Sequence, residues 1–88
     1  MVRTVIVQIV IDEDNNSYEI GNRVRVKMKP RDVKQPELAS EYIGFIDDIT
    51  EDMVYVATNV GVRNLLVNRI DKIRFAANDE DFNNTWDF

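Results

Sequence analysis

One stretch of this chain, residues 23–29, constrains the fold more than any other. Its residues alternate between basic and apolar side chains: Arg23, Val24, Arg25, Val26, Lys27, Met28 and Lys29. A period of two is that of a β-strand with one face buried and the other in water. Val, Ile and aromatic residues dominate the other periodic segments, whereas Ala and Leu are scarce in them, which favours strands over helices. We therefore expect an all-β fold.

Turn-forming residues divide the chain into five or six short strands. The strands are expected at residues 4–11, 23–29, 41–49, 53–58 and 63–67, and residues 69–75 close the domain. Pro30 ends the alternating strand, because proline cannot donate to a β-ladder, and Pro36 favours one helical turn in the loop that follows. The spacing of Ile70 and Ile73 predicts a 3₁₀ turn that leads into the last strand, with Phe75 beside them in the core. With 88 residues, the chain has room for one small core.

Several of these segments together resemble small barrels of the SH3-like and Sm-like type. The resemblance rests on residues 21–26 (GNRVRV), 44–49 (GFIDDI), 53–56 (MVYV) and 70–73 (IDKI). It implies a small, partly closed barrel, and a binding module more often than an enzyme. It covers roughly residues 20–75. No functional residue is carried onto this chain, because the aromatic groove of SH3 domains is not evident in the sequence.

The charge of the chain is divided unevenly along its length. All 11 Lys and Arg residues lie between Arg3 and Arg74, whereas residues 76–88 hold four acids and no base. The net charge of −5 is therefore −1 for residues 1–75 (11 − 12) and −4 for residues 76–88. We accordingly divide the chain into a barrel domain, 1–75, and an acidic aromatic C-terminal tail, 76–88. A short helix capped by Asn78 would place Phe82 and Trp86 of this tail on one face.

The chain contains no Cys and no His, and this absence excludes most enzyme chemistry. Zinc fingers, Cys nucleophiles and Ser-His-Asp triads all need one of these residues. The turn Asp12-x-Asp14-x-Asn16 begins like a calcium loop but lacks its Gly and its final Glu. We therefore expect a non-catalytic protein without a metal or cofactor. The longest apolar run is far shorter than the ~20 residues of a membrane span, and no signal peptide is evident, so we expect a cytoplasmic protein without membrane contact.

The basic strand is the first candidate binding site. Its face is formed by Arg23, Arg25, Lys27 and Lys29, and the following loop adds Arg31 and Lys34. Such a stripe would bind a nucleic-acid backbone or an acidic partner, including the acidic tail. Alternatively, it is a solvated face that pairs with acids on neighbouring strands. The acidity of the whole chain and the absence of aromatic residues within the stripe count against nucleic acid.

Two apolar regions are candidates for contacts between proteins. Residues 4–11 are apolar on both faces, and a small barrel buries only one of them. The other face would mediate self-association or be covered by the tail or the long loop. It is formed by Ile6, Gln8 and Val10 or else by Val5, Val7, Ile9 and Ile11. The aromatic residues of the tail, Phe82, Trp86 and Phe88, would dock on the barrel of the same or a neighbouring chain, or recruit another protein.

Together these features predict a non-catalytic macromolecular-interaction module that forms a homo-oligomer, of the kind found among bacterial and phage accessory proteins. The alternative is a small barrel that binds nucleic acid through residues Arg23 to Lys29.

Overall fold

The computed structural model describes residues 2–5, 9–30 and 40–82 and shows an all-β protein. Its elements are β1 (Arg3–Val5), β2 (Ile9–Ile11), β3 (Ser17–Glu19), β4 (Arg23–Met28), β5 (Glu41–Ile49), β6 (Met53–Thr58), β7 (Gly61–Leu66), the 3₁₀ turn η2 (Val67–Arg69) and β8 (Ile70–Phe75). Within the described ranges no helix has the length and apolar character needed to cross a membrane. The expected all-β class is confirmed.

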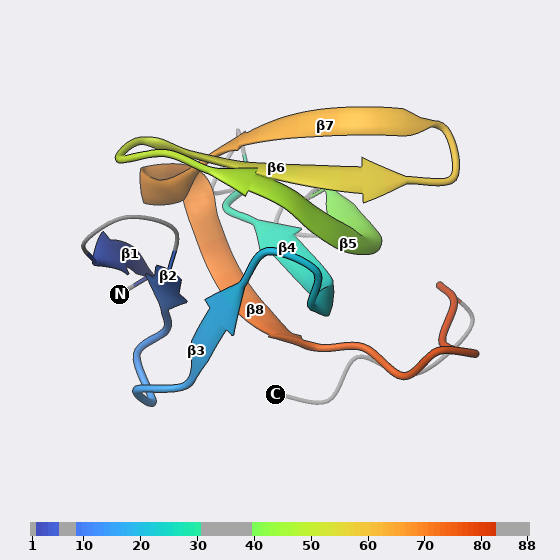
Figure 1. Ribbon diagram of the computed structural model, residues 1–88, viewed down its shortest axis with the longest axis horizontal. Helices are drawn as coiled ribbons and strands as arrows, with labels where there is room; N and C mark the ends of the chain where they lie inside the picture. The colour runs from blue at the N-terminus through green and yellow to red at the C-terminus, as the bar shows by residue number, and fades with distance from the viewer. Residues whose placement is uncertain (1, 6–8, 31–39, 83–88) are drawn as a thin grey trace.

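The strands form two antiparallel sheets (Figure 1). One sheet has the order β1-β2-β3, and the other has the order β7-β6-β5-β4-β8. In the larger sheet β4 to β7 follow one another as a meander, and β8 returns to pair with β4. This return brings the last strand of the chain beside the basic strand, which is the feature that shapes the candidate site.

The expected strands at 41–49 and 53–58 are confirmed at their residues, but the first strand was predicted wrongly. Residues 3–11 contain two short antiparallel strands instead of one long strand, because Arg3 pairs with Ile11 and Val5 with Ile9. The expected face of Ile6, Gln8 and Val10 is therefore not a single strand face. Ile6 and Gln8 lie outside the described residues, and Val10 is fully buried in the core.

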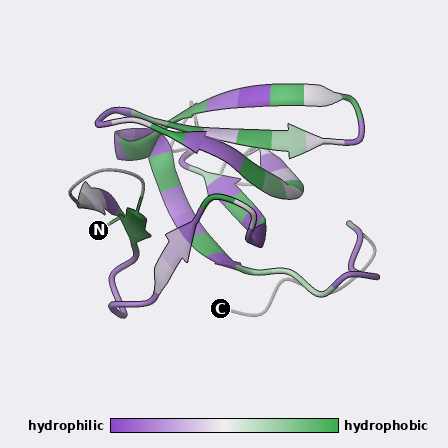
Figure 2. Ribbon diagram, in the orientation of Figure 1, coloured by the Kyte–Doolittle hydropathy of each residue, from purple (hydrophilic) through white to green (hydrophobic). Residues whose placement is uncertain are grey.

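Apolar residues at alternate positions of both sheets form one core (Figure 2). Its members are Val2, Val10, Tyr18, Val24, Val26, Ile46, Ile49, Val54, Val56, Leu65, Val67, Ile70 and Ile73. The 3₁₀ turn, Val67–Arg69, lies three residues earlier than expected, and Ile70 and Ile73 are both buried within strand β8. Phe75, expected in the core, is half-exposed and packs against the ring of Tyr18 at a centroid distance of 4.6 Å.

Strand β5 runs unusually close to β6 at Gly44. A Cβ atom at this position would lie 2.2 Å from the carbonyl oxygen of Ala57, so only glycine fits there without backbone movement. A bulge between Ile46 and Asp48 then bends the same strand. Both features let the nine-residue β5 curve across the core, as Figure 1 shows. The expected helical turn in the loop after Pro30 lies outside the described residues.

Candidate anion-binding face

The basic strand is placed beside a second row of basic residues. In the register of β4 with β8, Arg25 lies opposite Arg74 and Lys27 lies opposite Lys72. Like charges directly across an antiparallel pair are destabilising, so such a double row needs an anion to balance it. We call this surface the basic face, and it comprises Arg23, Arg25, Lys27, Lys29, Arg69, Lys72 and Arg74.

Glu80 of the C-terminal segment supplies one such anion. Its carboxylate accepts hydrogen bonds from Arg74 at 2.9 and 2.5 Å, one to each oxygen, which is a bidentate pair. Arg25 donates to the same carboxylate at 3.1 Å. The backbone N–H of Ala77 also donates to it, at 3.4 Å. Two arginines on neighbouring strands therefore hold one carboxylate, and we call this group the Glu80 clamp.

Two members of the Glu80 clamp are buried although their side chains are ionised. Arg25 is only 2% exposed and Glu80 only 7% exposed. The hydrogen bonds of Arg74 lower the pKa of Glu80 more than burial raises it, and those of Arg25 and Ala77 lower it further, to about 2. Arg25 also faces Glu41 of β5 at 3.5 Å. Arg25 is therefore buried and not solvated, but it does pair with an acid on a neighbouring strand and with the acidic tail, two of the partners expected for the stripe.

Arg23 fixes the backbone of the same segment. Its guanidinium donates to the carbonyl oxygens of Ala77 and Glu80, the latter at 3.0 Å. Phe82 then lies over Arg25, with its ring centroid 5.8 Å from the guanidinium carbon, a cation–π distance. Residues 76–82 contain a turn and not the expected helix, and three arginines hold that turn against β4 and β8.

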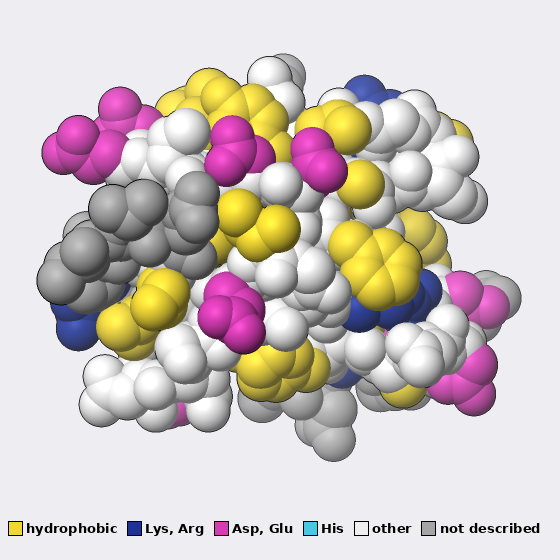
Figure 3. Space-filling model, viewed as in Figure 1, with side chains coloured by type: hydrophobic (Ala, Val, Ile, Leu, Met, Phe, Trp, Pro, Cys, Tyr) yellow, Lys and Arg dark blue, Asp and Glu magenta, His cyan; other side chains and the backbone are white. Residues whose placement is uncertain are grey.

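A hollow of about 400 Å³ opens between the C-terminal segment and the tip of the β6–β7 hairpin. Two aromatic side chains line it: Phe45, which lies opposite Arg23 on β5 and is 50% exposed, and Phe82, which is 58% exposed. Figure 3 shows Lys and Arg side chains between hydrophobic and acidic ones on this side of the molecule. Aromatic residues thus do lie beside the basic stripe, although none lies within it in the sequence.

The remainder of the basic face is open to solvent. Lys29 donates to the carbonyl oxygen of Asn68, and Arg69 donates to that of Lys29, so neither contact neutralises a charge. Lys72 forms an exposed ion pair with Glu13 at 3.1 Å, which raises the pKa of Lys72 and lowers that of Glu13. Glu13, Glu41 and Glu80 form ion pairs with members of the basic face, and its seven cations outnumber these three carboxylates.

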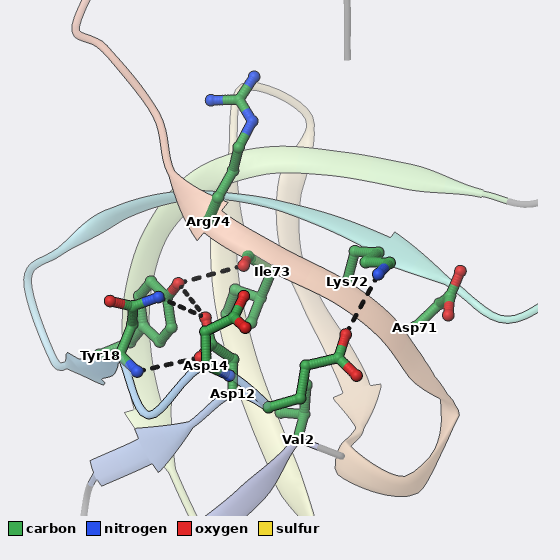
Figure 4. Close-up of a pocket in the computed structure, with 10 residues that line it drawn as sticks. Val2, Asp12, Asp14, Tyr18, Asp71, Lys72, Ile73 and Arg74 are labelled. Carbon is green, nitrogen blue, oxygen red and sulfur yellow. Dashed lines mark hydrogen bonds and ion pairs between the residues drawn. The ribbon is translucent and has the colours of Figure 1, made fainter. Parts of the chain in front are cut away.

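A second hollow, of about 290 Å³, lies between the β2–β3 turn and β8 (Figure 4). The Tyr18 hydroxyl lies within hydrogen-bonding distance of Asp12 Oδ2, 2.7 Å, and of the Ile73 carbonyl oxygen, 3.1 Å. Burial, followed by the neighbouring Asp12, raises the pKa of Tyr18, so its proton stays on the hydroxyl. The backbone N–H groups of Asp14 and Asn16 also donate to Asp12. This network joins the two sheets.

In residues 2–5, 9–30 and 40–82, no group of three or more His, Cys, Asp or Glu side chains could hold a metal ion. The residues singled out from the sequence but outside these ranges are Ile6, Gln8, Arg31, Lys34, Trp86 and Phe88. Sequence reasoning missed Arg69, Lys72 and Arg74 of the basic face, and it also missed Glu80 and the neighbouring Phe45. The spacing of Lys72 and Arg74 by two residues was a signal, but their pairing with β4 was not visible in the sequence.

The chain was also compared with known proteins. No family model, no curated protein and no solved structure matches it.

Proposed function

We propose that this protein is a non-catalytic binding module that binds a strand of single-stranded nucleic acid on its basic face. The observation that carries the proposal is the set of cations outside the Glu80 clamp, in which Lys27 lies opposite Lys72, beside the exposed ring of Phe45. A double row of like charges costs stability, and a bound polyanion would remove that cost.

The dimensions of the basic face suit a chain of phosphates better than a single small anion. Same-face residues recur about every 6.6 Å along a strand, so the row from Arg23 to Lys29 spans about 20 Å. Four exposed or half-buried cations lie away from the Glu80 clamp: Lys27, Lys29, Arg69 and Lys72. We assign the phosphate contacts to these four residues, because Arg25 and Arg74 are held by the buried Glu80, whereas the ion pair of Lys72 with Glu13 is exposed and contributes little stability.

The aromatic residues decide between single and double strands. Bases of a single strand stack on exposed aromatic rings, at a gain of about 1–3 kcal/mol for each base, whereas the bases of a duplex are already stacked. Phe45 and Phe82 line the same hollow next to Arg23. The Glu80 clamp holds Phe82 in this place through the segment it anchors. The clamp is therefore a positioning element for the stacking surface.

We further propose that the larger sheet is a partly closed barrel of the SH3-like or Sm-like type. Its support is the connectivity: a four-stranded meander, a 3₁₀ turn, and a last strand that pairs with the first strand of the meander. The three-stranded sheet at the N-terminus is an addition to that plan. In this arrangement the basic face and the β6–β7 hairpin lie on opposite sides of β5.

The proposal is tested by fluorescence anisotropy with a labelled oligothymidylate at low and moderate salt. Four phosphate contacts predict that log K falls with log[salt] with a slope of roughly −3, since each contact on a single strand contributes about −0.7. The double variant Lys27→Glu/Lys72→Glu should weaken binding by at least about tenfold. Arg63→Glu changes a charge on β7, away from the basic face, and is the control with little effect. Absence of binding at low salt would refute the proposal.

A further inference from the structure

Strand β7 is an edge of the larger sheet that has little of the usual protection against pairing, with Arg63 as its one charged side chain. Its sequence, Gly61 to Leu66, contains no proline, no lysine and no acid, and its register with β6 runs without a bulge. Native edge strands are commonly blocked by one of these devices. We infer that β7 is the surface through which two copies of this chain pair, by antiparallel addition of β7 to β7.

The opposite edge of the same sheet is not available for such pairing. The Ile73 carbonyl oxygen of β8 lies 3.1 Å from the Tyr18 hydroxyl, and Lys72 is paired with Glu13. Both contacts come from the N-terminal sheet, which covers β8 from that side (Figure 4). Addition of β7 to β8 of another copy would have to displace them. A symmetric β7–β7 contact displaces nothing that the structure describes.

The backbone of β7 decides which groups face outward. Thr58 and Gly61 pair across the two-residue turn formed by residues 59 and 60, so the N–H and C=O of Gly61 face β6. These groups alternate sides along a strand, so Val62, Asn64 and Leu66 present theirs to the free edge. A second β7 can therefore hydrogen-bond only through these three residues.

Side chains then select the register. With Asn64 opposite Asn64 of the second copy, Val62 lies opposite Leu66 on each side of the two-fold axis. Val62 is 51% exposed and Leu66 is 44% exposed, so both pairs bury apolar surface. The neighbouring register would place Arg63 against Arg63 and Val62 against Asn64, which adds like-charge repulsion and loses both apolar pairs.

Charge also favours this edge as the meeting point of two copies. The chain carries a net charge of −5, so two copies repel over most approaches. The β6–β7 hairpin, residues 53–66, contains no carboxylate and one cation, Arg63. In the register centred on Asn64, Arg63 faces Leu65 of the second copy, and the two guanidiniums lie on a diagonal. Hydrophobic side chains are exposed along the upper rim where β6 and β7 lie (Figure 3).

The register is tested with single cysteines, which are unique labels because the chain has none of its own. Hydrogen-bonded pairs across antiparallel strands have Cα atoms about 5.5 Å apart, within the range of a disulfide. Asn64→Cys should therefore form a disulfide dimer on mild oxidation. Arg63→Cys should not form a disulfide dimer, because residue 63 of one copy and residue 63 of the other are diagonal neighbours, about 7–8 Å apart. Cross-linking of Arg63→Cys in preference to Asn64→Cys would overturn the register.

Association itself is tested with proline. At position 64 proline removes an outward N–H, so β6 pairing remains, whereas a second copy loses a hydrogen bond and meets the proline ring. Asn64→Pro should weaken the dimer at least tenfold in light scattering, while its melting temperature at low concentration stays near that of the wild type. Val62→Lys, which places charge in the apolar pairs, should do the same. A wild-type protein that stays monomeric up to about 1 mM would overturn the inference, because even a dimer with that Kd would be stabilised by only ~4 kcal/mol. Neither outcome depends on nucleic-acid binding.

Discussion

Replacement of Glu80 by Gln tests how the C-terminal segment is held on the sheet. Gln keeps the shape of the side chain but removes the charge that balances Arg25 and Arg74. Arg25 would then be left 2% exposed, with Glu41 at 3.5 Å as its remaining carboxylate partner among the described residues. We expect the variant to fold with a looser C-terminal segment and with lower stability.

The size of the effect follows from two independent estimates. The pKa of Glu80 falls from 4.5 to about 2, and each pKa unit corresponds to about 1.4 kcal/mol, which sets an upper limit of roughly 3 kcal/mol. Removal of one partner from a buried ion pair costs about 3–5 kcal/mol. Arg74 is about one quarter exposed and Arg25 keeps Glu41, so the expected loss is nearer to 2 kcal/mol. For a domain of this size that loss lowers the melting temperature by about 8–16 °C.

Urea unfolding at pH 7 measures the loss, with Asp79→Asn as the matched control. Asp79 is an exposed acid in the same segment, so its variant removes the same charge outside the clamp. Because the pKa of Glu80 is lowered by folding, its contribution is complete above pH 4.5 and is lost as the pH falls towards 2. The difference between wild type and Glu80→Gln should shrink over that range. Equal stabilities of Glu80→Gln and Asp79→Asn at pH 7 would show that the clamp does not hold the segment.

Two further substitutions test the parts of the fold that position the site. Tyr18→Phe removes the hydroxyl that joins Asp12 to Ile73 and should cost about 1.5–3 kcal/mol in urea unfolding, since a hydrogen bond to a charged group is lost. In the wild type the pKa of Tyr18 is raised. One of the three tyrosines should therefore resist ionisation in an ultraviolet titration above pH 10 until the protein unfolds. Gly44→Ala places a Cβ atom against the Ala57 carbonyl and should cost about 2 kcal/mol or more of stability by thermal melting. Gly61→Ala should cost about 1 kcal/mol, because nothing lies within 4 Å of the added atom but φ is +116°. Equal melting temperatures for Gly44→Ala and the wild type would refute the close approach of β5 to β6.

The sequence was sufficient for elements whose signals are local. Residues 41–49 and 53–58 were placed at their exact strand bounds because alternation is flanked there by the acidic turn of Glu51 and Asp52. The hairpin of β1 and β2 was missed because the residues between the two strands, Ile6, Val7 and Gln8, include no turn-forming type. The pattern of side chains in such a segment is the same whether the chain continues as one strand or reverses in a hairpin.

The candidate site depended on contacts that no local pattern contains. The alternation of residues 23–29 matches strand β4 for Arg23, Arg25 and Lys27, whereas Lys29 lies just beyond its end; the second row comes from β8, about 50 residues later. Glu80 is one of three consecutive acids in the sequence, and nothing there distinguishes it from Asp79 or Asp81. Its special environment arises because the chain leaves β8 next to Arg74 and turns back at residues 78 and 79. Phe45 joins the face only through its register with Arg23.

The most direct test of nucleic-acid binding is a map of the amide shifts in a ¹⁵N NMR spectrum during titration with oligothymidylate at low salt. Binding on the basic face predicts shifts in β4 and β8, from Arg23 to Lys29 and from Arg69 to Arg74, together with Phe45 and Phe82. Amides of β7 should stay unchanged. Shifts confined to residues outside the basic face, or no shifts with excess oligonucleotide at low salt, would contradict the proposed function.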